Sequence, residues 1–547
     1  MNENDNSSSK RLFLQLSKDT IVTPIPHLLG TNGTLKNEAE IQSLQGFIKT
    51  AEGKLKTVDE LMLRTQRAFH CMSSYRTRLM TVIQTHRPFL SVKRNIPDDV
   101  LREIFIHCCA SQENGPLARS PPQLALTQVC RAWRTVAVTC PRLWSNITFK
   151  TSLAVTPVLN GRYLQLQQWI ERSGGVPLTI HVVRTHYDPT TDINFVYSHF
   201  RLRIEPAMNL MVAHCLRWAN VNLCFVTQED AKRILAPVRG ELPLLHTLRL
   251  QTEYADVQQQ DSVLHLFNGA PKLHILDLTY HFSFFADSFP WGQLTSCTLI
   301  KPGPMWAFEA LSILPHTPAL TVLQANYPSI WRDQNIMLLN PIEHKSLRKL
   351  VLFEIGASGA ITGANLQLGQ ILEALTLPML TELILHCCTS PWCQQQFLDF
   401  ASRSQKITKL ELQSINFSPN QLVQCLRATS AITHLTLRVF NNNFSDPNLL
   451  SALTLQPNLQ QNCMLLSLQT LVLVGPALLS PMFLDMLTSR WSRKLEDQRN
   501  KSLQQVVVDL EGMYQLAATS DDDFIRLGMM KQNGFQLTKL REGKMVG

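Results

Sequence analysis

The sequence predicts an α+β multidomain protein in which a long N-terminal helix is followed by a short helical hairpin and then by an α/β solenoid of repeats. Three observations support this division. Apolar residues recur at heptad spacing from Ile41 to Ile83, two short amphipathic segments lie between Ile96 and Trp144, and a Leu-x-x-Leu-x-Leu pattern returns about ten times from Leu245 onward. Because the chain has 547 residues, it is too long for one hydrophobic core, and two or three modules are expected.

Composition and charge narrow the class of protein. Hydrophobic residues make up 45% of the chain and charged residues 17%, which is typical of folded proteins. The formal net charge of +9 is spread along the chain without a basic block, so it indicates a solvated surface rather than a face that binds nucleic acid. The N-terminus does not read as a signal peptide and no stretch is long enough to cross a bilayer, so we expect a cytoplasmic or nuclear protein without membrane contact.

The 13 cysteines are scattered, without a Cys-x-x-Cys pair. An odd number at irregular spacing does not indicate a disulfide framework. Adjacent pairs, such as Cys387 with Cys388, do not offer the spaced ligands of a zinc site. We therefore expect reduced and mostly buried thiols, with no metal ion and no cofactor.

The N-terminal part of the chain is predicted to form a tail and then one long helix. Residues 1–34 are rich in Asn, Ser, Thr and Pro, which is typical of a flexible tail. Residues 35–87 are predicted to form a coiled-coil-like helix that Pro88 ends. Its apolar seam, with spacings of three and four, consists of Ile41, Leu44, Ile48, Ala51, Leu55, Val58, Met62, Thr65, Phe69, Met72, Arg76, Leu79 and Ile83.

This helix needs a packing partner. Gly46 and Gly53 each cost about 1 kcal/mol of helix stability, so the seam must be stabilised by contacts with another surface. The sequence leaves two partners open: a second copy of residues 41–83, or the downstream part of the same chain. Arg76 is a charged seam position, which can fix the register or limit the oligomer.

Residues 92–150 are predicted to hold a hairpin of two short helices. In the first, Pro97 suits the first helical position, and Asp98 and Asp99 favour the positive end of the helix dipole. A loop-like insert, 107–123, leads to the second. Neither helix is long enough to be stable alone, so they must pack on each other or on a partner. The apolar faces are Val100, Leu101, Ile104 and Phe105 in the first helix, and Leu126, Val129, Cys130, Trp133, Val136 and Ala137 in the second.

This stretch resembles the F-box. The resemblance rests on four pieces that occur in order: Ile96-Pro97, Ile104-Phe105, Val129-Cys130-Arg131-Ala132-Trp133 and Pro141-Arg142-Leu143-Trp144. The insert departs from a compact F-box and is common in the F-box-like proteins of fungi. The resemblance implies an apolar face that docks a Skp-type adaptor and, through it, a cullin. It assigns the adaptor contacts to Ile96, Pro97, Val100, Leu101, Ile104, Phe105, Leu126, Val129, Cys130, Trp133, Pro141 and Trp144.

Repeats fill most of the remaining chain. Residues 151–240 are predicted to form a transition segment with one helix, one strand at 176–183 and a first weak repeat. In the array proper, 241–515, the first positions of successive motif copies lie 28, 21, 26, 27, 33, 27, 25, 36 and 35 residues apart. Spacing of this size indicates a solenoid with a strand and a helix in each repeat. The copies begin at Leu245, Leu273, Leu294, Leu320, Leu347, Leu380, Ile407, Ile432, Leu468 and Leu503.

The array resembles leucine-rich repeats of the variable kind found behind F-boxes. The Asn or Cys that normally follows the strand in that family is not regularly placed here, and the uneven repeat lengths indicate projecting loops. Alternating strands and helices also fit a doubly wound α/β domain, but ten strands of such uniform signature favour the solenoid. Residues 516–547 are expected to add one or two capping helices and a tail.

The residues between the leucines of each motif are predicted to line the concave face of the solenoid. On a strand these positions point away from the core, and here they form a polar ladder of mixed charge. Such a ladder suits the surface of another protein better than a small molecule. We expect target contacts from His246, Arg249, His274, Asp277, Arg348, Lys349, Glu382, Lys409, Glu411 and His434.

Enzyme motifs are missing from the sequence. It lacks Gly-x-Ser-x-Gly, the phosphate loop Gly-x-x-x-x-Gly-Lys-Ser/Thr and His-Glu-x-x-His, so we expect no catalysis by this chain. Together the two resemblances imply the substrate-recognition subunit of a Skp-cullin-F-box ubiquitin ligase. Two other functions stay open: a coiled-coil and repeat scaffold unconnected to ubiquitin, with the hairpin as a structural remnant, and a nucleic-acid or regulatory binding module.

Overall fold

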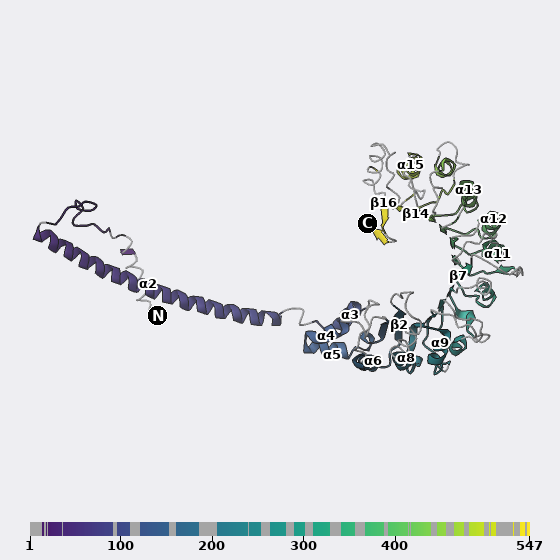
Figure 1. The fold of residues 1–547 in the computed structure, drawn as a ribbon, viewed down its shortest axis with the longest axis horizontal. Coiled ribbons are helices and arrows are strands. Elements are labelled where there is room, and N and C mark those ends of the chain that lie inside the picture. Colours follow the sequence, from purple (N-terminus) through teal and green to yellow (C-terminus); the bar gives the residue numbers. More distant parts are fainter. Residues whose placement is uncertain are drawn as a thin grey trace. The chain divides into compact units, whose positions relative to one another are not determined.

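The computed structural model describes residues 14–15, 18, 20–35, 37–90, 96–109, 121–151, 160–184, 205–238, 240–252, 263–279, 289–300, 310–328, 341–355, 367–387, 392–413, 415, 417–438, 446–455, 464–474, 481–496, 503, 505–509, 529, 536–541 and 544–546. The chain divides into two compact units, residues 1–100 and 101–547. Figure 1 labels the helices and strands of both. Within the predicted tail, residues 26–30 form a turn, in which the N–H of Leu28 donates to the carbonyl of Ile25 at 3.1 Å.

The long N-terminal helix is confirmed as α2, Glu38–His86. It begins at Asn37, whose side chain accepts the backbone N–H of Ala39 at 3.1 Å. It ends where the 3₁₀ turn η1, Arg87–Leu90, begins, because Pro88 lacks the N–H that a further helical turn would use. None of the residues of α2 is buried, and most residues of its apolar seam are exposed.

The segment that follows contains three helices, where the sequence predicts two. We call α3 to α5, with the turn η3, the helical segment. Of the predicted insert 107–123, residues 110–120 lie outside the described residues. The elements are α3 Asp98–Cys108, α4 Pro122–Val129, α5 Arg131–Val138 and η3 Pro141–Leu143.

The predicted second helix is broken at Cys130, which has an extended backbone with φ −159° and ψ 172°. Its sulfur accepts the backbone N–H of Trp133 at 3.4 Å and so caps α5. The guanidinium of Arg134 donates to the carbonyl of Thr127 at 2.7 Å, which satisfies one carbonyl near the end of α4. The expected single apolar stripe was therefore wrong, since Val129 and Trp133 lie on different helices.

Fifteen strands form one sheet in the order of the chain, apart from β8 and β10, which pair with each other. Neighbours run parallel up to β16, and β17 is antiparallel to β16. A doubly wound domain would place its strands out of chain order, so this order confirms a leucine-rich-repeat-like solenoid. The strands are β1 Asn146–Thr151, β2 Leu178–Arg184, β3 Trp218–Phe225, β4 Thr247–Thr252, β5 Ile275–Thr279, β6 Ser296–Ile300, β7 Val322–Pro328, β8 Ile342–Glu343, β9 Lys349–Ile355, β10 Leu375–Thr376, β11 Glu382–His386, β12 Lys409–Gln413, β13 His434–Arg438, β14 Thr470–Val474, β15 Gln505–Asp509, β16 Gln536–Arg541 and β17 Lys544–Val546.

Every one of the ten motif copies contributes one strand: β4 to β7, β9 and β11 to β15. Strand β12 shows the pattern, because Leu410 and Leu412 are buried while Lys409 and Glu411 are not. The parallel register places Leu410 opposite Leu435 of the next strand. Equivalent leucines therefore stack from repeat to repeat into one continuous core.

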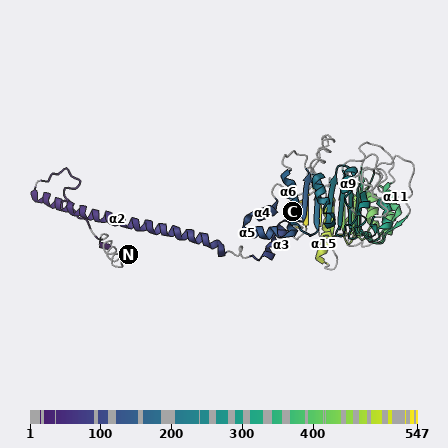
Figure 2. The ribbon, with the colours of Figure 1, turned by 90° about the horizontal axis from the view of Figure 1, so that it is seen from below.

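Helices and turns cover the outer side of the sheet, and Figures 1 and 2 show the strands side by side on the inner side of the solenoid. Local signals fix these helices. Ser418 and Gln421 form a capping box at the start of α13, and the 21-residue repeat from Leu273 to Leu294 has room only for a turn. The elements are α6 Asn160–Arg172, α8 Glu205–Val212, η4 Cys215–Arg217, α9 Gln228–Leu235, η5 Val263–Phe267, η6 Trp291–Gln293, η7 Leu314–His316, α11 Gln367–Ala374, α12 Gln394–Arg403, α13 Pro419–Ala428, α14 Pro447–Leu453 and α15 Pro481–Glu496.

The sheet extends past the predicted array at both ends. Strands β1, β2 and β3 precede it in parallel register, and β2 and β3 lie within the predicted transition segment 151–240. These strands lack the full leucine motif, and only β2 was predicted as a complete strand. After residue 515, the described residues include the strands β16 and β17, and the stretches 516–528 and 530–535, where capping helices are predicted, lie outside the described residues.

Threonines tie successive repeats together at the edge where the strands begin. Each one stands immediately before its strand, and its hydroxyl donates to the carbonyl of the corresponding residue one repeat earlier, at 2.9 to 3.2 Å. These bonds satisfy edge carbonyls in an array that lacks the regular Asn or Cys of strict leucine-rich repeats. The residues are Thr295, Thr321, Thr381, Thr408 and Thr433.

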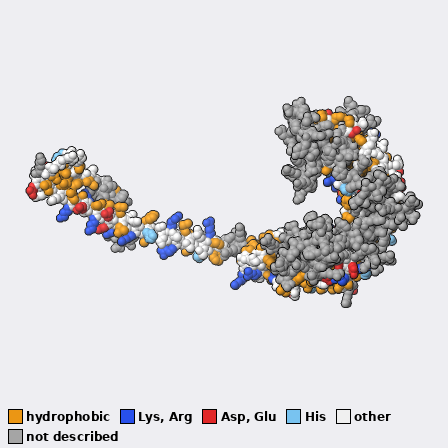
Figure 3. All heavy atoms as spheres, viewed as in Figure 1, with side chains coloured by type: hydrophobic (Ala, Val, Ile, Leu, Met, Phe, Trp, Pro, Cys, Tyr) orange, Lys and Arg blue, Asp and Glu red, His pale blue; other side chains and the backbone are white. Residues whose placement is uncertain are grey.

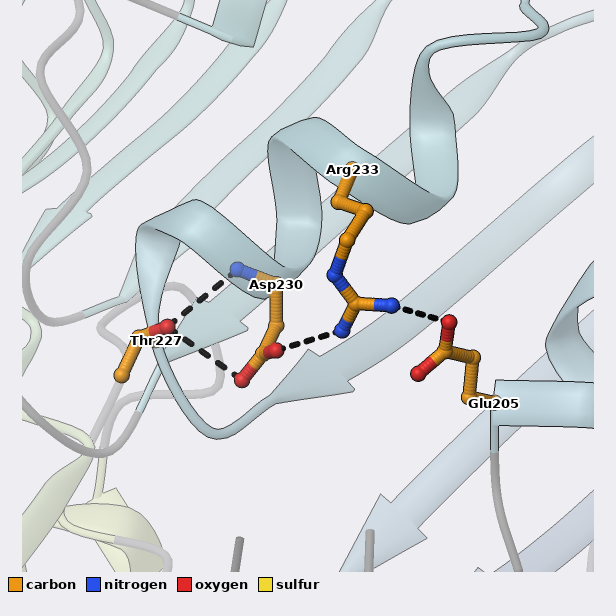
Figure 4. A network of polar contacts seen from close by, with 4 residues as sticks. All are labelled: Glu205, Thr227, Asp230 and Arg233. Carbon is orange, nitrogen blue, oxygen red and sulfur yellow. Dashed lines mark hydrogen bonds and ion pairs between the residues drawn. The ribbon is translucent and has the colours of Figure 1, made fainter. Parts of the chain in front are cut away.

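An ion-pair network holds α9 against α8 (Figure 4). Arg233 pairs with Asp230 one turn earlier, with Nη2 to Oδ1 at 2.7 Å, and with Glu205 at the start of α8. The hydroxyl of Thr227 donates to the other oxygen of Asp230 at 3.2 Å and accepts the Asp230 N–H at 3.2 Å. Asp230 is buried, so its carboxylate depends on these partners.

Replacing Asp230 with alanine should lower the free energy of unfolding by about 2 kcal/mol, as judged by chemical denaturation. The change leaves Thr227 and Arg233 without their buried acceptor, although Arg233 is partly exposed and water offsets part of the loss. Glu205→Gln keeps a hydrogen-bond acceptor and should cost less than half as much. Equal losses in the two variants would contradict the central role given to Asp230.

Candidate protein-binding surfaces

Trp144 lies at the junction between the helical segment and the first helix of the solenoid. Its indole N–H donates to the carbonyl of Ala137 at 2.9 Å. Its ring meets that of Trp169 edge to face, with centroids 4.6 Å apart, and the guanidinium of Arg172 lies 4.6 Å from the ring centroid. The side chain is fully buried, so the helical segment and α6 share one core.

The predicted adaptor contacts fall into three groups by exposure. Leu101, Phe105 and Trp144 are buried inside the chain, which leaves them unavailable to a partner without unfolding. Ile96, Leu126, Trp133 and Pro141 are half-buried, and Trp133 packs on Phe105 with ring centroids 4.9 Å apart. The exposed group, which can contact a partner directly, comprises Pro97, Val100, Ile104, Val129 and Cys130.

Helix α3 is apolar on two sides. Leu101 and Phe105, four residues apart, face the core, while Val100 and Ile104, also four apart, remain 46% and 41% exposed. Val129 at the end of α4 is 59% exposed. These exposed apolar side chains are available to a partner that covers this part of the helical segment.

The face of the sheet opposite to the helices carries the predicted target residues in two groups. The outward positions of neighbouring strands lie in register, so their side chains form rows across the sheet. Strands β6 and β7 separate the groups and carry Ser296, Thr298, Val322 and Gln324 at these positions. The first group is Arg249 and Asp277 on β4 and β5, and the second is Lys349, Glu382, Lys409, Glu411 and His434 on β9 and β11 to β13.

Opposite charges alternate along the second group. Lys349 and Glu382 form an ion pair of 2.6 Å between β9 and β11, and Lys409 follows Glu382 in the same row. In the first group, Arg249 lies 3.7 Å from Asp277. All four paired side chains remain 25% to 50% exposed, so they can exchange their partners for charges on another protein.

Three predicted target residues lie elsewhere. His246, His274 and Arg348 stand one residue before β4, β5 and β9, at the edge of the sheet rather than on its outward rows. The rings of His246 and His274 stack with centroids 6.1 Å apart. The motif has two residues between its first two leucines, and only the second of them is on the strand.

A further row was missed by the sequence motif. Arg438 is one position beyond the last leucine of its copy and lies 3.2 Å from Glu411. His386 is at the equivalent place on β11, with its ring against Phe353 at 5.9 Å between centroids. Extending the alternation by one step past the final leucine of each motif would have found these residues.

The outward face of the sheet is partly desolvated by its own side chains. Burial raises the pKa of Asp277, although the Thr279 hydroxyl and Arg249 oppose the shift. Burial and the nearby Lys409 lower the pKa of His434, and burial also lowers the pKa of His386. Burial on this face therefore favours the neutral forms of these three side chains.

Among the residues that the structure describes, no group of three or more His, Cys, Asp or Glu could hold a metal ion. The described cysteines are free thiols, and burial raises the pKa of Cys387, Cys393 and Cys425 to about 12. Such thiols are not reactive nucleophiles. A search of the described helices finds none that is long and apolar enough to span a membrane.

Comparisons with known proteins give a limited result. No protein-family model matches the chain. No curated protein matches it either. Among solved structures, the chain is similar to the leucine-rich repeat-containing protein LegL7 from Legionella pneumophila, with 15% sequence identity and a TM-score of 0.32. That similarity covers 60% of this chain and 93% of the other.

Proposed function

We propose that this chain is the substrate-recognition subunit of a Skp-cullin-F-box ubiquitin ligase. The exposed apolar residues of the helical segment would dock the Skp-type adaptor, and the outward face of the sheet would hold the target protein. The chain itself would catalyse nothing, since its part is to bring a lysine of the target near the ubiquitin-loaded enzyme. It would work in the cytoplasm or the nucleus, without nucleic acid.

The outward face of the sheet carries the target-binding half of this proposal. Along one row, Lys349, Glu382 and Lys409 alternate in charge on neighbouring strands that lie about 4.8 Å apart, and Glu411 adds an acidic side chain in the next row. A partner covering several strands can meet these charges with a complementary row of its own. Extended concave faces of solenoids bind proteins in this way, whereas a small molecule would need an enclosed pocket.

The resemblance to the F-box and the second apolar side of α3 support the adaptor-binding half. Ile104 faces water although it belongs to the second piece that carries the resemblance, and Val100, one turn earlier on α3, is exposed beside it. Val129, in the third piece, is also exposed. Covering such side chains with the apolar groove of an adaptor would remove them from water, and about 25 cal/mol is gained for each Å² so buried.

One observation favours a second function, a scaffold unconnected to ubiquitin. Trp144 and Trp169 fuse the helical segment to the first helix of the solenoid. Solenoids need a cap that closes the end of their core, and the helical segment would then serve only as that cap. In this case its exposed apolar residues would have no adaptor to meet.

Adaptor binding decides between the two functions. A purified Skp-type adaptor is titrated into the full chain by calorimetry, beside the variants Val129→Glu and Gln128→Glu. Both variants add one charge near the exposed end of α4, but only the first removes an apolar contact. We expect the wild type and Gln128→Glu to bind equally and Val129→Glu to bind at least tenfold more weakly, with unchanged circular dichroism.

The opposite results are equally clear. Equal binding by all three forms would remove α4 from the docking surface. If no form binds the adaptor or co-purifies with a cullin, the ligase function is wrong and the scaffold stands.

A further inference from the structure

We propose that α2 pairs with the α2 helix of a second copy of this chain, and that the two helices run antiparallel. This goes beyond the recognition function, because it concerns self-association. It rests on three features of residues 38–86: an uncovered apolar seam, an uneven distribution of charge along the helix, and an arginine within the seam.

The seam needs a partner. Three of its central residues are more than half exposed, namely Leu55 at 61%, Met62 at 65% and Phe69 at 69%. A helix of 49 residues is about 74 Å long, and its own hydrogen bonds hardly stabilise it when Gly46 and Gly53 interrupt it. A seam that repeats over six heptads is matched in length and spacing by a second copy of itself.

The charges of α2 divide at about residue 60. The first part, 38–60, has five acidic residues and three lysines, so its net charge is 3 − 5 = −2. The second part, 61–86, has four arginines and no acidic residue, so its net charge is +4. Figure 3 shows the same division, with red side chains confined to one half of the helix. The arginines are Arg64, Arg67, Arg76 and Arg78.

This division decides the orientation. A parallel, in-register pair would bring +4 against +4 and would place Arg76 of one copy against Arg76 of the other inside the seam. An antiparallel pair brings +4 against −2 twice and separates the two Arg76 side chains. The helix dipoles also oppose each other favourably in this orientation.

Self-association is tested first by sedimentation equilibrium on the full chain, with Phe69→Glu and Ser74→Glu compared. Phe69 is a seam residue, whereas Ser74 lies on the opposite side of the helix and is exposed. Neither is buried in the single chain, so both variants should fold. We expect a dimer for the wild type and for Ser74→Glu, and at least tenfold weaker dimerisation for Phe69→Glu. A wild-type chain that stays monomeric up to about 100 μM, or equal dissociation constants for the two variants, would overturn the proposal.

Orientation is tested by reversing charges at low salt, where about 10 mM gives a screening length of roughly 30 Å. One variant reverses the second part with Arg64→Glu, Arg67→Glu and Arg78→Glu. Another reverses the first part with Glu52→Lys, Asp59→Lys and Glu60→Lys. In an antiparallel pair, each variant alone brings like charges together and weakens the dimer, while the six changes combined restore it.

A parallel pair predicts a different outcome. Arginines that face arginines would become glutamates that face glutamates, so the first variant would dimerise no more weakly than the wild type. That result would overturn the antiparallel orientation. Adaptor binding by these variants should not change, so failure of this proposal is distinguishable from failure of the ligase function.

Discussion

Replacing Trp144 with alanine should lower the free energy of unfolding of the first repeats by about 3–5 kcal/mol. The indole is fully buried and contacts Trp169 and Arg172, so its loss leaves a large cavity between the helical segment and α6. It also removes the donor to the carbonyl of Ala137. Chemical denaturation and hydrogen exchange of α5, β1 and α6 would measure the effect.

Trp133→Ala is the matched control for this prediction. Trp133 is half-buried and packs mainly on Phe105, so its loss should cost clearly less stability than the loss of Trp144. If Trp144→Ala were as stable as the wild type but could not bind an adaptor, Trp144 would be a partner contact, as the F-box resemblance implied. A stable variant of that kind would contradict the shared core.

The repeat motif predicted the solenoid well because one physical constraint generates it. Two leucines separated by one residue must face the core of a short strand, and a third anchors the turn that enters the strand. All ten copies accordingly form strands of one sheet. Strands β1 and β3 lack the leucine pattern, since their buried residues include Ile147 and Trp218, so the motif did not find them fully.

The helical segment was less predictable. Apolar residues three and four positions apart indicate a helix with an apolar face. This spacing does not tell which of two adjacent apolar sides faces the core. Leu101 and Val100 are neighbours on the predicted apolar face, yet Leu101 is buried and Val100 is exposed. The break at Cys130 was also hidden, since it depends on a cap from the cysteine sulfur to Trp133.

The sequence motif predicted two of the rows of side chains that form the candidate target surface. Period-two alternation placed Lys349, Glu382 and Lys409 correctly on neighbouring strands. The motif ended one residue too early to include Arg438 and started one residue too early at His246. Strand length is set by pairing with neighbours, and a single repeat does not contain that information.

Replacing Arg490 with methionine should lower the free energy of unfolding of the last repeats by about 3–5 kcal/mol. Arg490 of α15 is only 3% exposed, and its guanidinium donates to the carbonyls of Leu453, Met464 and Leu465 at 2.7, 2.8 and 2.9 Å. Methionine fills similar space but donates nothing, so three buried carbonyls lose a charged donor. Leu465 has φ +51°, a conformation that needs such support.

Arg403→Met is the control for Arg490. Arg403 of α12 donates in the same way to the carbonyls of Leu372, Glu373 and Leu375, but it is half exposed, so water can replace part of its bonds. We expect it to cost less than half as much as the change at Arg490. Equal losses in the free energy of unfolding would show that burial does not determine how much these arginines stabilise the fold.

The two ends of the solenoid should respond separately to these changes. Each repeat contacts only its neighbours, so stability is lost near the altered residue and spreads little. Hydrogen exchange should therefore accelerate in β14 and β15 for the Arg490 variant and in β1 and β2 for the Trp144 variant, with β5 to β7 protected in both. Uniform acceleration across all strands would mean that the sheet unfolds as one cooperative unit, and target binding would then depend on every repeat rather than on those that carry the charges.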